Sequence, residues 1–298
     1  MYTIEISGER LQPHAGTLRS TLSDLLARLH ARDTGLDPAH LVRVVVADAP
    51  DAGNSPAQGG MPPLLRSGDA NAVVLNLAAP FVEQALAGES DQLLQMVHAM
   101  HRELWRARIA TDPAPLATAD ALAAQFSPIA ALMLDEYRAN RHSAWSLPGN
   151  ADLLLPHLLG LLDELPAAGE RALAQCRQDG DIGQFAGLTI ARLTHLMQTA
   201  AFCLGYLAGL GRTAADVSPE LKAGIDASIL AGEWPRMAAL LAGAAACDGE
   251  ARALQLDMLR IRALAVLGRM GLHVRLDADG TVWTGLADDP ALAGATRH

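Results

Sequence analysis

Two histidines, His98 and His101, stand three residues apart in a stretch whose apolar spacing predicts a helix. Successive residues of an α-helix turn by about 100°, so these two imidazoles lie about 60° apart on one face. The same face carries apolar side chains, namely Leu94, Val97, Leu104 and Trp105. Neutral imidazoles placed in this way can share one metal ion, because each offers a ring nitrogen as a ligand. The spacing makes His98 and His101 candidate metal ligands.

The segments around this helix add a strand and a carboxylate. A β-rich run, Asn71–Leu77, precedes the histidines, and a later helical stretch, Asp135–His142, contains Glu136. The order of strand, two-histidine helix and later carboxylate resembles the gluzincin branch of the zincin metallopeptidases. The resemblance covers about residues 41–142, roughly a third of the chain.

The zincin resemblance implies a site, and three residues depart from the family motif HExxH. It implies a strand running along the substrate, and one zinc ion held by His98, His101 and Glu136. It also makes Arg102, Tyr137 and Arg141 candidates for lining the cleft. However, Ala99 stands where the motif has its proton-accepting glutamate. Arg102 stands where the motif has its second histidine, and His101 comes one residue early.

These departures leave three hypotheses for function. The first is a degenerate zincin relative without metal, in which the Arg102 guanidinium replaces the metal charge and pairs with Glu136. Such a binding or regulatory module would hold an extended peptide or protein partner against Asn71–Leu77 by strand addition. The second is an active metal-dependent hydrolase, a peptidase, with Glu103 or another acidic residue as its base. Glu103 lies about 140° around the helix from His98, which is poor geometry for that role. The third is a helical scaffold that offers only a partner surface.

Composition limits the class of protein further. The 298 residues carry a net charge of −10, which disfavours binding to phosphate backbones and so to nucleic acid. The stretch closest to a membrane span, Leu193–Leu210, is broken by polar residues, which favours a buried core helix. The first residues lack the features of a signal peptide, and three scattered cysteines form no disulfide framework. These features predict a cytoplasmic protein without membrane association; they leave its oligomeric state open.

Periodicity predicts an α+β fold that is predominantly α, with a small N-terminal sheet packed on helices and a helical C-terminal half. Strands are expected at Tyr2–Ser7, Leu41–Ala47 and Asn71–Leu77, with a long loop over Asp48–Gly68. Helices of the first half are expected over about 18–32, 81–87, 91–110 and 118–145, the last with a kink or restart at Pro128.

The Leu147–Asn150 segment is the best candidate for a domain boundary, because it combines proline, glycine and asparagine. It divides the chain into a zincin-like α+β domain, 1–147, and a mostly helical domain or extension, 148–298. Helices of the second part are expected near 151–164, 167–178, 182–210, 219–231, 235–246 and 249–270. Two short strands, 272–276 and 281–285, flank Asp277–Gly280; this turn chemistry favours a hairpin over a calcium loop.

Three single residues of the second half receive structural interpretations. Gly205 permits two helices to approach closely, Cys203 is a buried and inert thiol, and His195 is a core or interface residue.

Overall fold

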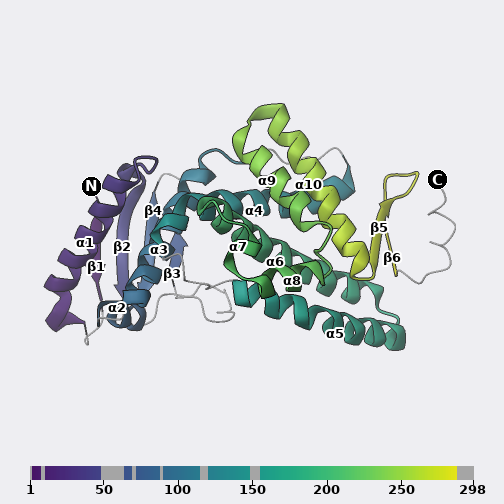
Figure 1. Ribbon diagram of the computed structural model, residues 1–298, viewed down its shortest axis with the longest axis horizontal. Helices are drawn as coiled ribbons and strands as arrows, with labels where there is room; N and C mark the ends of the chain where they lie inside the picture. The colour runs from purple at the N-terminus through teal and green to yellow at the C-terminus, as the bar shows by residue number, and fades with distance from the viewer. Residues whose placement is uncertain are drawn as a thin grey trace. The chain divides into compact units, whose positions relative to one another are not determined.

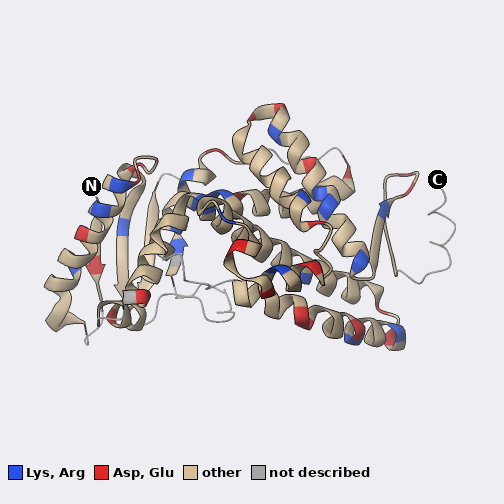
Figure 2. Cartoon of the chain, in the orientation of Figure 1, with Lys and Arg blue, Asp and Glu red and all other residues tan. Residues whose placement is uncertain are grey.

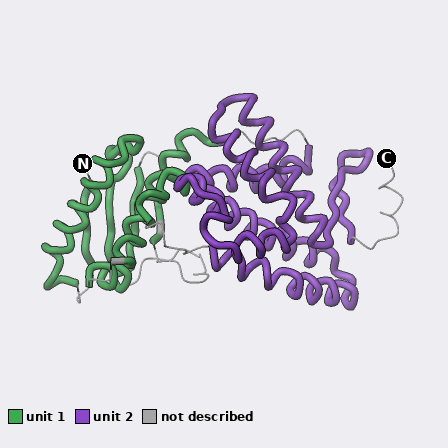
Figure 3. The backbone as a smooth tube through the Cα atoms, viewed as in Figure 1, with its two compact units in different colours: residues 1–113, 139–151 green, residues 114–138, 152–298 purple. Residues whose placement is uncertain are grey.

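The computed structural model describes residues 2–7, 11–47, 64–68, 72–87, 90–114, 120–147 and 155–286. Its architecture is α+β and predominantly α, with a small N-terminal sheet and a helical C-terminal half, as the sequence predicts (Figure 1). The chain forms two compact units (Figure 3). Unit 1 comprises residues 1–113 and 139–151, and unit 2 comprises residues 114–138 and 152–298.

Unit 1 contains a four-stranded mixed sheet with the order β1-β2-β4-β3. Its strands are β1 (Thr3–Ile6), β2 (Leu41–Ala47), β3 (Leu64–Ser67) and β4 (Val73–Ala78). The first, second and fourth run parallel, and β3 pairs antiparallel with β4. The strand predicted at Asn71–Leu77 corresponds to β4, which pairs with β2. Because β4 has a neighbour on each side, a peptide cannot add to it as a strand, contrary to the sequence-based expectation.

The edge strand β3 lies within the segment that the sequence predicts as a loop. Its four residues find their backbone partners on β4, in a register that places Leu64 opposite Leu77 and Ser67 opposite Val74. Gly68 follows with a φ of 91°, a conformation that favours glycine and turns the chain out of the strand. A strand this short carries too little periodicity to be recognised without its partner. The rest of the expected loop, residues 48–63, lies outside the described residues.

Helices of unit 1 cover the sheet with apolar faces. They are α1 (Ala15–Arg32), α2 (Ala79–Leu86) and α3 (Ser90–Ala110), with the short 3₁₀ turns η1 (Gln12–His14) and η2 (Pro38–His40). The core of this unit is made of leucine and valine from β2 and β4 and of one face of α1, which buries Leu18, Leu22, Leu26 and Leu29. Burial of these faces is what holds α3 against the sheet.

The next helix, α4 (Ala121–Ser143), contributes to both units and is followed by the 3₁₀ turn η3 (Ala144–Ser146). The sequence suggests one boundary, near residues 147–150. The division into units instead crosses α4, whose residues up to Arg138 belong to unit 2 and whose last residues belong to unit 1. The helix does not restart at Pro128, since α4 continues through it, and a kink there stays a prediction. A proline removes only one hydrogen bond, and long helices packed on their neighbours tolerate that loss.

Unit 2 is helical apart from one hairpin. Its further helices are α5 (Leu155–Asp179), α6 (Ile182–Gly209), α7 (Ala214–Val217), α8 (Pro219–Asp226), α9 (Trp234–Ala246) and α10 (Gly249–Arg269). The expected break between two helices near residues 164–167 is wrong, because α5 passes through Pro166. The predicted hairpin is confirmed, with β5 (Leu272–Leu276) antiparallel to β6 (Val282–Leu286).

The longest helix, α6, has the buried character predicted for Leu193–Leu210. Its second half buries residues on every side, including Cys203, whose pKa is raised by that burial. A thiol held protonated in an apolar core is unreactive, as expected. His195 is half-buried and its ring meets the ring of His157 edge to face. Within the described ranges, no helix combines the length and apolar character needed to cross a membrane.

Gly205 of α6 fits against the backbone of α4. A Cβ atom built on this glycine would lie 2.4 Å from the carbonyl oxygen of Tyr137 and 2.9 Å from its Cα. Both are backbone atoms, so neither can move aside as a flexible side chain would. The close approach that the sequence predicts at Gly205 is therefore present, and its partner is Tyr137.

Replacing Gly205 with alanine is expected to lower the free energy of unfolding by about 1–3 kcal/mol, because overpacking forces the two helices apart. The matched control is Gly187→Ala in the same helix, where an added Cβ meets nothing within 4 Å. That control should stabilise the protein by up to about 1 kcal/mol, since alanine favours helix more than glycine does. Urea unfolding followed by circular dichroism gives both values. Equal effects of the two substitutions would contradict the packing argument.

Candidate functional site

The candidate site of unit 1 is built on the buried face of α3. His98 is 4% exposed and His101 is fully buried, so both imidazoles point into the protein as their spacing predicts. Burying an imidazole costs free energy unless its ring nitrogens find hydrogen-bond partners. The partners come from two segments far away in the sequence, η3 and the residues that follow α1.

Both histidines converge on the hydroxyl of Ser146 in η3. The Nδ1 atom of His98 lies 3.2 Å from Ser146 Oγ, and the Nδ1 atom of His101 lies 3.0 Å from the same oxygen. His98 Nδ1 also lies 3.1 Å from the carbonyl oxygen of Ser143, which is 2.7 Å from Ser146 Oγ. One serine hydroxyl thus occupies the point between two imidazoles where the zincin resemblance would place a metal ion.

The other ring nitrogen of His101 is held by Asp33, directly after α1. His101 Nε2 lies 2.7 Å from Asp33 Oδ2, the same oxygen that accepts a hydrogen bond from Trp105 Nε1 at 2.8 Å. Asp33 Oδ1 accepts a further hydrogen bond from the backbone N–H of Gly35. Burial acts to raise the pKa of Asp33, but the hydrogen bonds from Trp105, His101 and Gly35 together hold it below its ordinary value.

Protonation states follow from this environment. Burial, helped by the charge of Arg102, lowers the pKa of His98 to about 3, and burial lowers the pKa of His101 more than Asp33 raises it. Both rings are therefore neutral near pH 7. Asp33 can only accept, so His101 carries its proton on Nε2. The Ser146 hydroxyl donates its one proton to the Ser143 carbonyl, and His101 Nδ1 lies 3.0 Å from the hydroxyl oxygen. His98 carries its proton on Nδ1, where the Ser143 carbonyl accepts it.

Aromatic rings enclose this network. Trp145 meets the His101 ring edge to face, with 4.7 Å between centroids, and Trp105 stacks on His142 at 3.8 Å. The Arg32 guanidinium lies 4.1 Å from the centre of the Trp145 ring. Rings packed in this way exclude water, which strengthens the hydrogen bonds inside.

Asp33, His101 and Ser146 are the residue types of an acyl-transfer triad, linked in the same order. Their setting does not suit that chemistry. Ser146 is 6% exposed, its Oγ also lies within hydrogen-bond distance of the Ser143 carbonyl, and it lines neither the cavity beside η2 nor the cavity of unit 2. A nucleophile must reach its substrate, so we interpret the three residues as a structural hydrogen-bond network.

The histidines fit a metal poorly in this arrangement. A ligating nitrogen must present its lone pair to the metal, but both ring nitrogens of His101 have partners within the protein. Among the described residues, no group of three or more His, Cys, Asp or Glu side chains is placed to hold a metal ion. Ligation of zinc by His98, His101 and Glu136 stays a prediction.

Glu103, the candidate base, lies in a cluster of three arginines. Its Oε1 atom is 3.1 Å from Arg102 Nη2 and 3.0 Å from Arg106 Nη1, and Oε2 is 3.8 Å from Arg66 Nε on β3. Burial acts to raise the pKa of Glu103, yet the charges of Arg106, Arg102 and Arg66 hold it below its ordinary value. A carboxylate whose pKa is lowered accepts protons less readily, which disfavours Glu103 as a general base.

The remaining candidates lie on α4. Glu136 is 2% exposed, and its Oε1 accepts a hydrogen bond of 2.7 Å from Gln198 Nε2 on α6. Tyr137 is also buried and lines a cavity of unit 2. Arg141 is exposed and falls in unit 1. Pairing of Arg102 with Glu136 stays a prediction.

Sequence reasoning missed Asp33 and Ser146. Asp33 lies 68 residues before His101, and Ser146 lies 45 residues after it. Neither stands in a motif, and a single aspartate after a helix or a single serine near a tryptophan is an ordinary event in a sequence. No local signal identifies them, because only folding brings them to the histidines.

Comparison of the chain with protein-family models, with curated proteins and with solved structures gives no match. The interpretation of the site accordingly depends on its geometry and on the motif of α3.

Replacing His98 with asparagine is expected to change the pH dependence of stability. The folded pKa of about 3 lies below the ordinary value of 6.5, so below about pH 6 the unfolded chain binds a proton that the folded chain does not. Above about pH 6, His98 makes its full contribution to the free energy of unfolding. As the pH falls towards about 3, the free energy of unfolding decreases through this histidine by up to about 1.4 kcal/mol per pH unit. The amide of the new side chain does not titrate and can still donate to Ser143, so the variant should lose this slope.

Urea unfolding at about pH 7 and about pH 5 measures this difference. The parent and the His98→Asn variant both carry Trp234→Phe and Trp283→Phe. The remaining tryptophans, Trp105 and Trp145, belong to unit 1 and report its unfolding by fluorescence. Identical pH dependence in the parent and the variant would show that His98 does not resist protonation.

Proposed function

We propose that unit 1 is a metal-free, catalytically degenerate relative of the zincins that binds an extended peptide segment of a partner. The observation that carries this proposal is the convergence of His98 and His101 on Ser146 Oγ. Two imidazoles that would bind zinc in the related peptidases are here bound to a hydroxyl. Ala99 adds to this argument, because it is 5% exposed and has no proton acceptor in its side chain.

The edge strand β3 is the place where a peptide can add. It is last in the order β1-β2-β4-β3, so it pairs with β4 on one side and with no described strand on the other. It also packs against α3, the histidine helix, and Arg66 of β3 forms an ion pair with Glu103 of α3. This supports a shift of the peptide site from β4, the strand expected from the sequence, to β3. Strand addition supplies backbone hydrogen bonds whatever the peptide sequence.

The full chain, incubated with zinc and then desalted, is expected to retain far less than one zinc ion per chain. The double variant Ala99→Glu, Arg102→His restores the HExxH pattern and should retain more zinc, because it adds an imidazole and removes a repelling cation. Ala99→Glu with Arg102→Gln is the control, since it removes the same charge without adding a ligand. Elemental analysis by mass spectrometry provides the measurement.

One result would replace the degenerate-relative proposal with the active-hydrolase hypothesis. This result is a parent chain that holds one zinc ion and loses it on His98→Ala. In that case zinc-dependent peptide cleavage should also be measurable, at a rate lowered by about 10²–10⁴ through the missing base at position 99.

Peptides selected from a random phage-displayed library on the full chain are expected to slow amide hydrogen exchange in β3. The other edge strand, β1, is the internal control, because it also lacks a second described neighbour but lies at the opposite end of the sheet. Mass spectrometry of fragments covering 64–67 and 3–6 compares the two. Protection of β1 alone, or failure to select any peptide, would reject strand addition at β3.

A further inference from the structure

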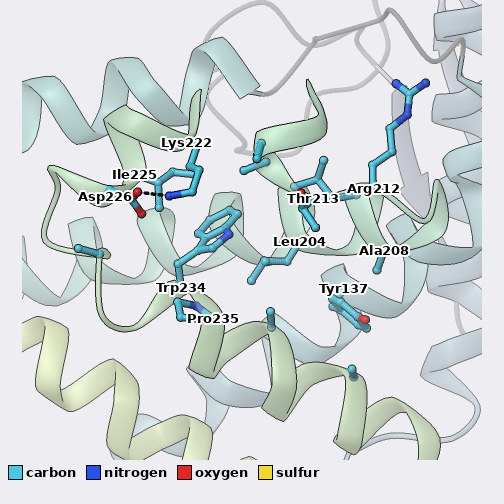
Figure 4. A pocket seen from close by; sticks show the side chains of 16 residues that line it. Tyr137, Leu204, Ala208, Arg212, Thr213, Lys222, Ile225, Asp226, Trp234 and Pro235 are labelled. Atoms are coloured by element: carbon cyan, nitrogen blue, oxygen red, sulfur yellow. Dashed lines mark hydrogen bonds and ion pairs between the residues drawn. The ribbon is translucent and has the colours of Figure 1, made fainter. Parts of the chain in front are cut away.

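A cavity of about 680 Å³ lies within unit 2, among the end of α6, α7, α8, α9 and Tyr137 of α4 (Figure 4). This size falls in the range of pockets that hold small organic ligands. Every lining residue belongs to unit 2, so the cavity does not depend on the site described above.

The cavity exists because its walls are built from small residues. Six of the sixteen lining residues are alanines, at positions 208, 214, 215, 231, 238 and 242. Larger apolar side chains complete the surface, among them Leu204, Ile225 and Trp234. Alanine methyl groups cannot fill the space between three or more helices, so an apolar volume remains.

One ion pair lies on the wall of the cavity. Lys222 of α8 pairs with Asp226 one turn later, and both side chains are more than half exposed. In Figure 4 this ion pair lies beside the Trp234 ring. Lys222 is the only lysine in the chain. Its ammonium has three N–H donors, so it can meet a second acceptor while it keeps Asp226.

The formal charge of the lining favours an anion. Arg212 and Lys222 contribute two positive charges and Asp226 one negative charge, which leaves +1 in a chain whose net charge is −10. The hydroxyl of Thr213 is already bonded to the carboxylate of Asp216. Of the two lining cations, Lys222 lies beside the Trp234 ring, whereas the Arg212 side chain extends away from that ring (Figure 4).

We propose that this cavity binds a small amphipathic carboxylate. The apolar tail lies against Leu204, Ile225 and Trp234, and the carboxylate accepts hydrogen bonds from Lys222 Nζ. Burial of the tail supplies the greater part of the affinity, and the ammonium supplies the preference for an anion. This ligand site is independent of the peptide site proposed for unit 1, so each can fail without the other.

The single lysine gives a direct probe of the site. Reductive methylation of the full chain with ¹³C-formaldehyde labels only Lys222 and the α-amino group. It keeps both charged but leaves one N–H on each, so the label reports the nearness of the ligand and the unmethylated chain reports the affinity. Octanoate is expected to shift the Lys222 resonance to saturation and leave the α-amino resonance in place. Calorimetry on the unmethylated chain should give octanoate an affinity about threefold to fivefold higher than that of octanol. This ratio corresponds to the free energy that one partly exposed ion pair contributes.

Two charge variants test the role of the ion pair in opposite directions. Lys222→Gln should weaken octanoate binding, while Asp226→Asn should strengthen it by removing a carboxylate next to that of the ligand. Neither should change the affinity for octanol. Equal affinities for octanoate and octanol in the parent chain would overturn the assignment of an anion site.

A volume variant tests the location. Ala238→Phe places a ring in the cavity and should weaken octanoate about tenfold or more, which corresponds to the loss of about 1.4 kcal/mol. Ala239→Phe is the matched control, because residue 239 is the next on α9, is exposed and does not line the cavity. Equal binding by these two variants, or an unchanged Lys222 resonance with octanoate, would overturn the proposal.

Discussion

Burial of two neutral imidazoles on α3 is the constraint on which the architecture of unit 1 depends. A buried ring nitrogen without a partner costs free energy, and helix α3 cannot supply partners from its own backbone. Asp33 and η3 supply them instead. The end of α1, the middle of α3 and the turn after α4 are therefore fixed to one another through a few hydrogen bonds of 2.7–3.2 Å. The tryptophans around them keep water away from this junction.

The same requirement, that a buried polar group be satisfied, governs the charged clusters. Glu103 in unit 1 is surrounded by Arg66, Arg102 and Arg106. In unit 2, Glu233 is 1% exposed and lies 3.1 to 3.7 Å from Arg236, Arg262 and Arg269. Elsewhere, basic and acidic residues are scattered along the helices of both units (Figure 2). Buried ion pairs of this kind fix register between segments more than they add stability.

Seen together, the two units suggest two different kinds of recognition. Unit 1 offers a sheet edge beside a buried hydrogen-bond network formed by Asp33, His101 and Ser146. Unit 2 offers an apolar volume left by alanines, with a single lysine on its wall. Backbone hydrogen bonding would dominate the first and burial of apolar surface the second.

The sequence alone determined most of the secondary structure, because apolar periodicity is local. The spacing of leucines predicts α1, α3 and α6, and a β-branched run predicts β2. The turn residues Asp277–Gly280 predict the hairpin β5–β6. It also predicts that His98 and His101 face inward. Only the tertiary structure decided what those histidines contact, because Asp33 and Ser146 are 68 and 45 residues away and carry no motif. The edge strand β3, the uninterrupted α5 and the cavity were likewise decided by packing, since each depends on neighbours that the local sequence does not specify.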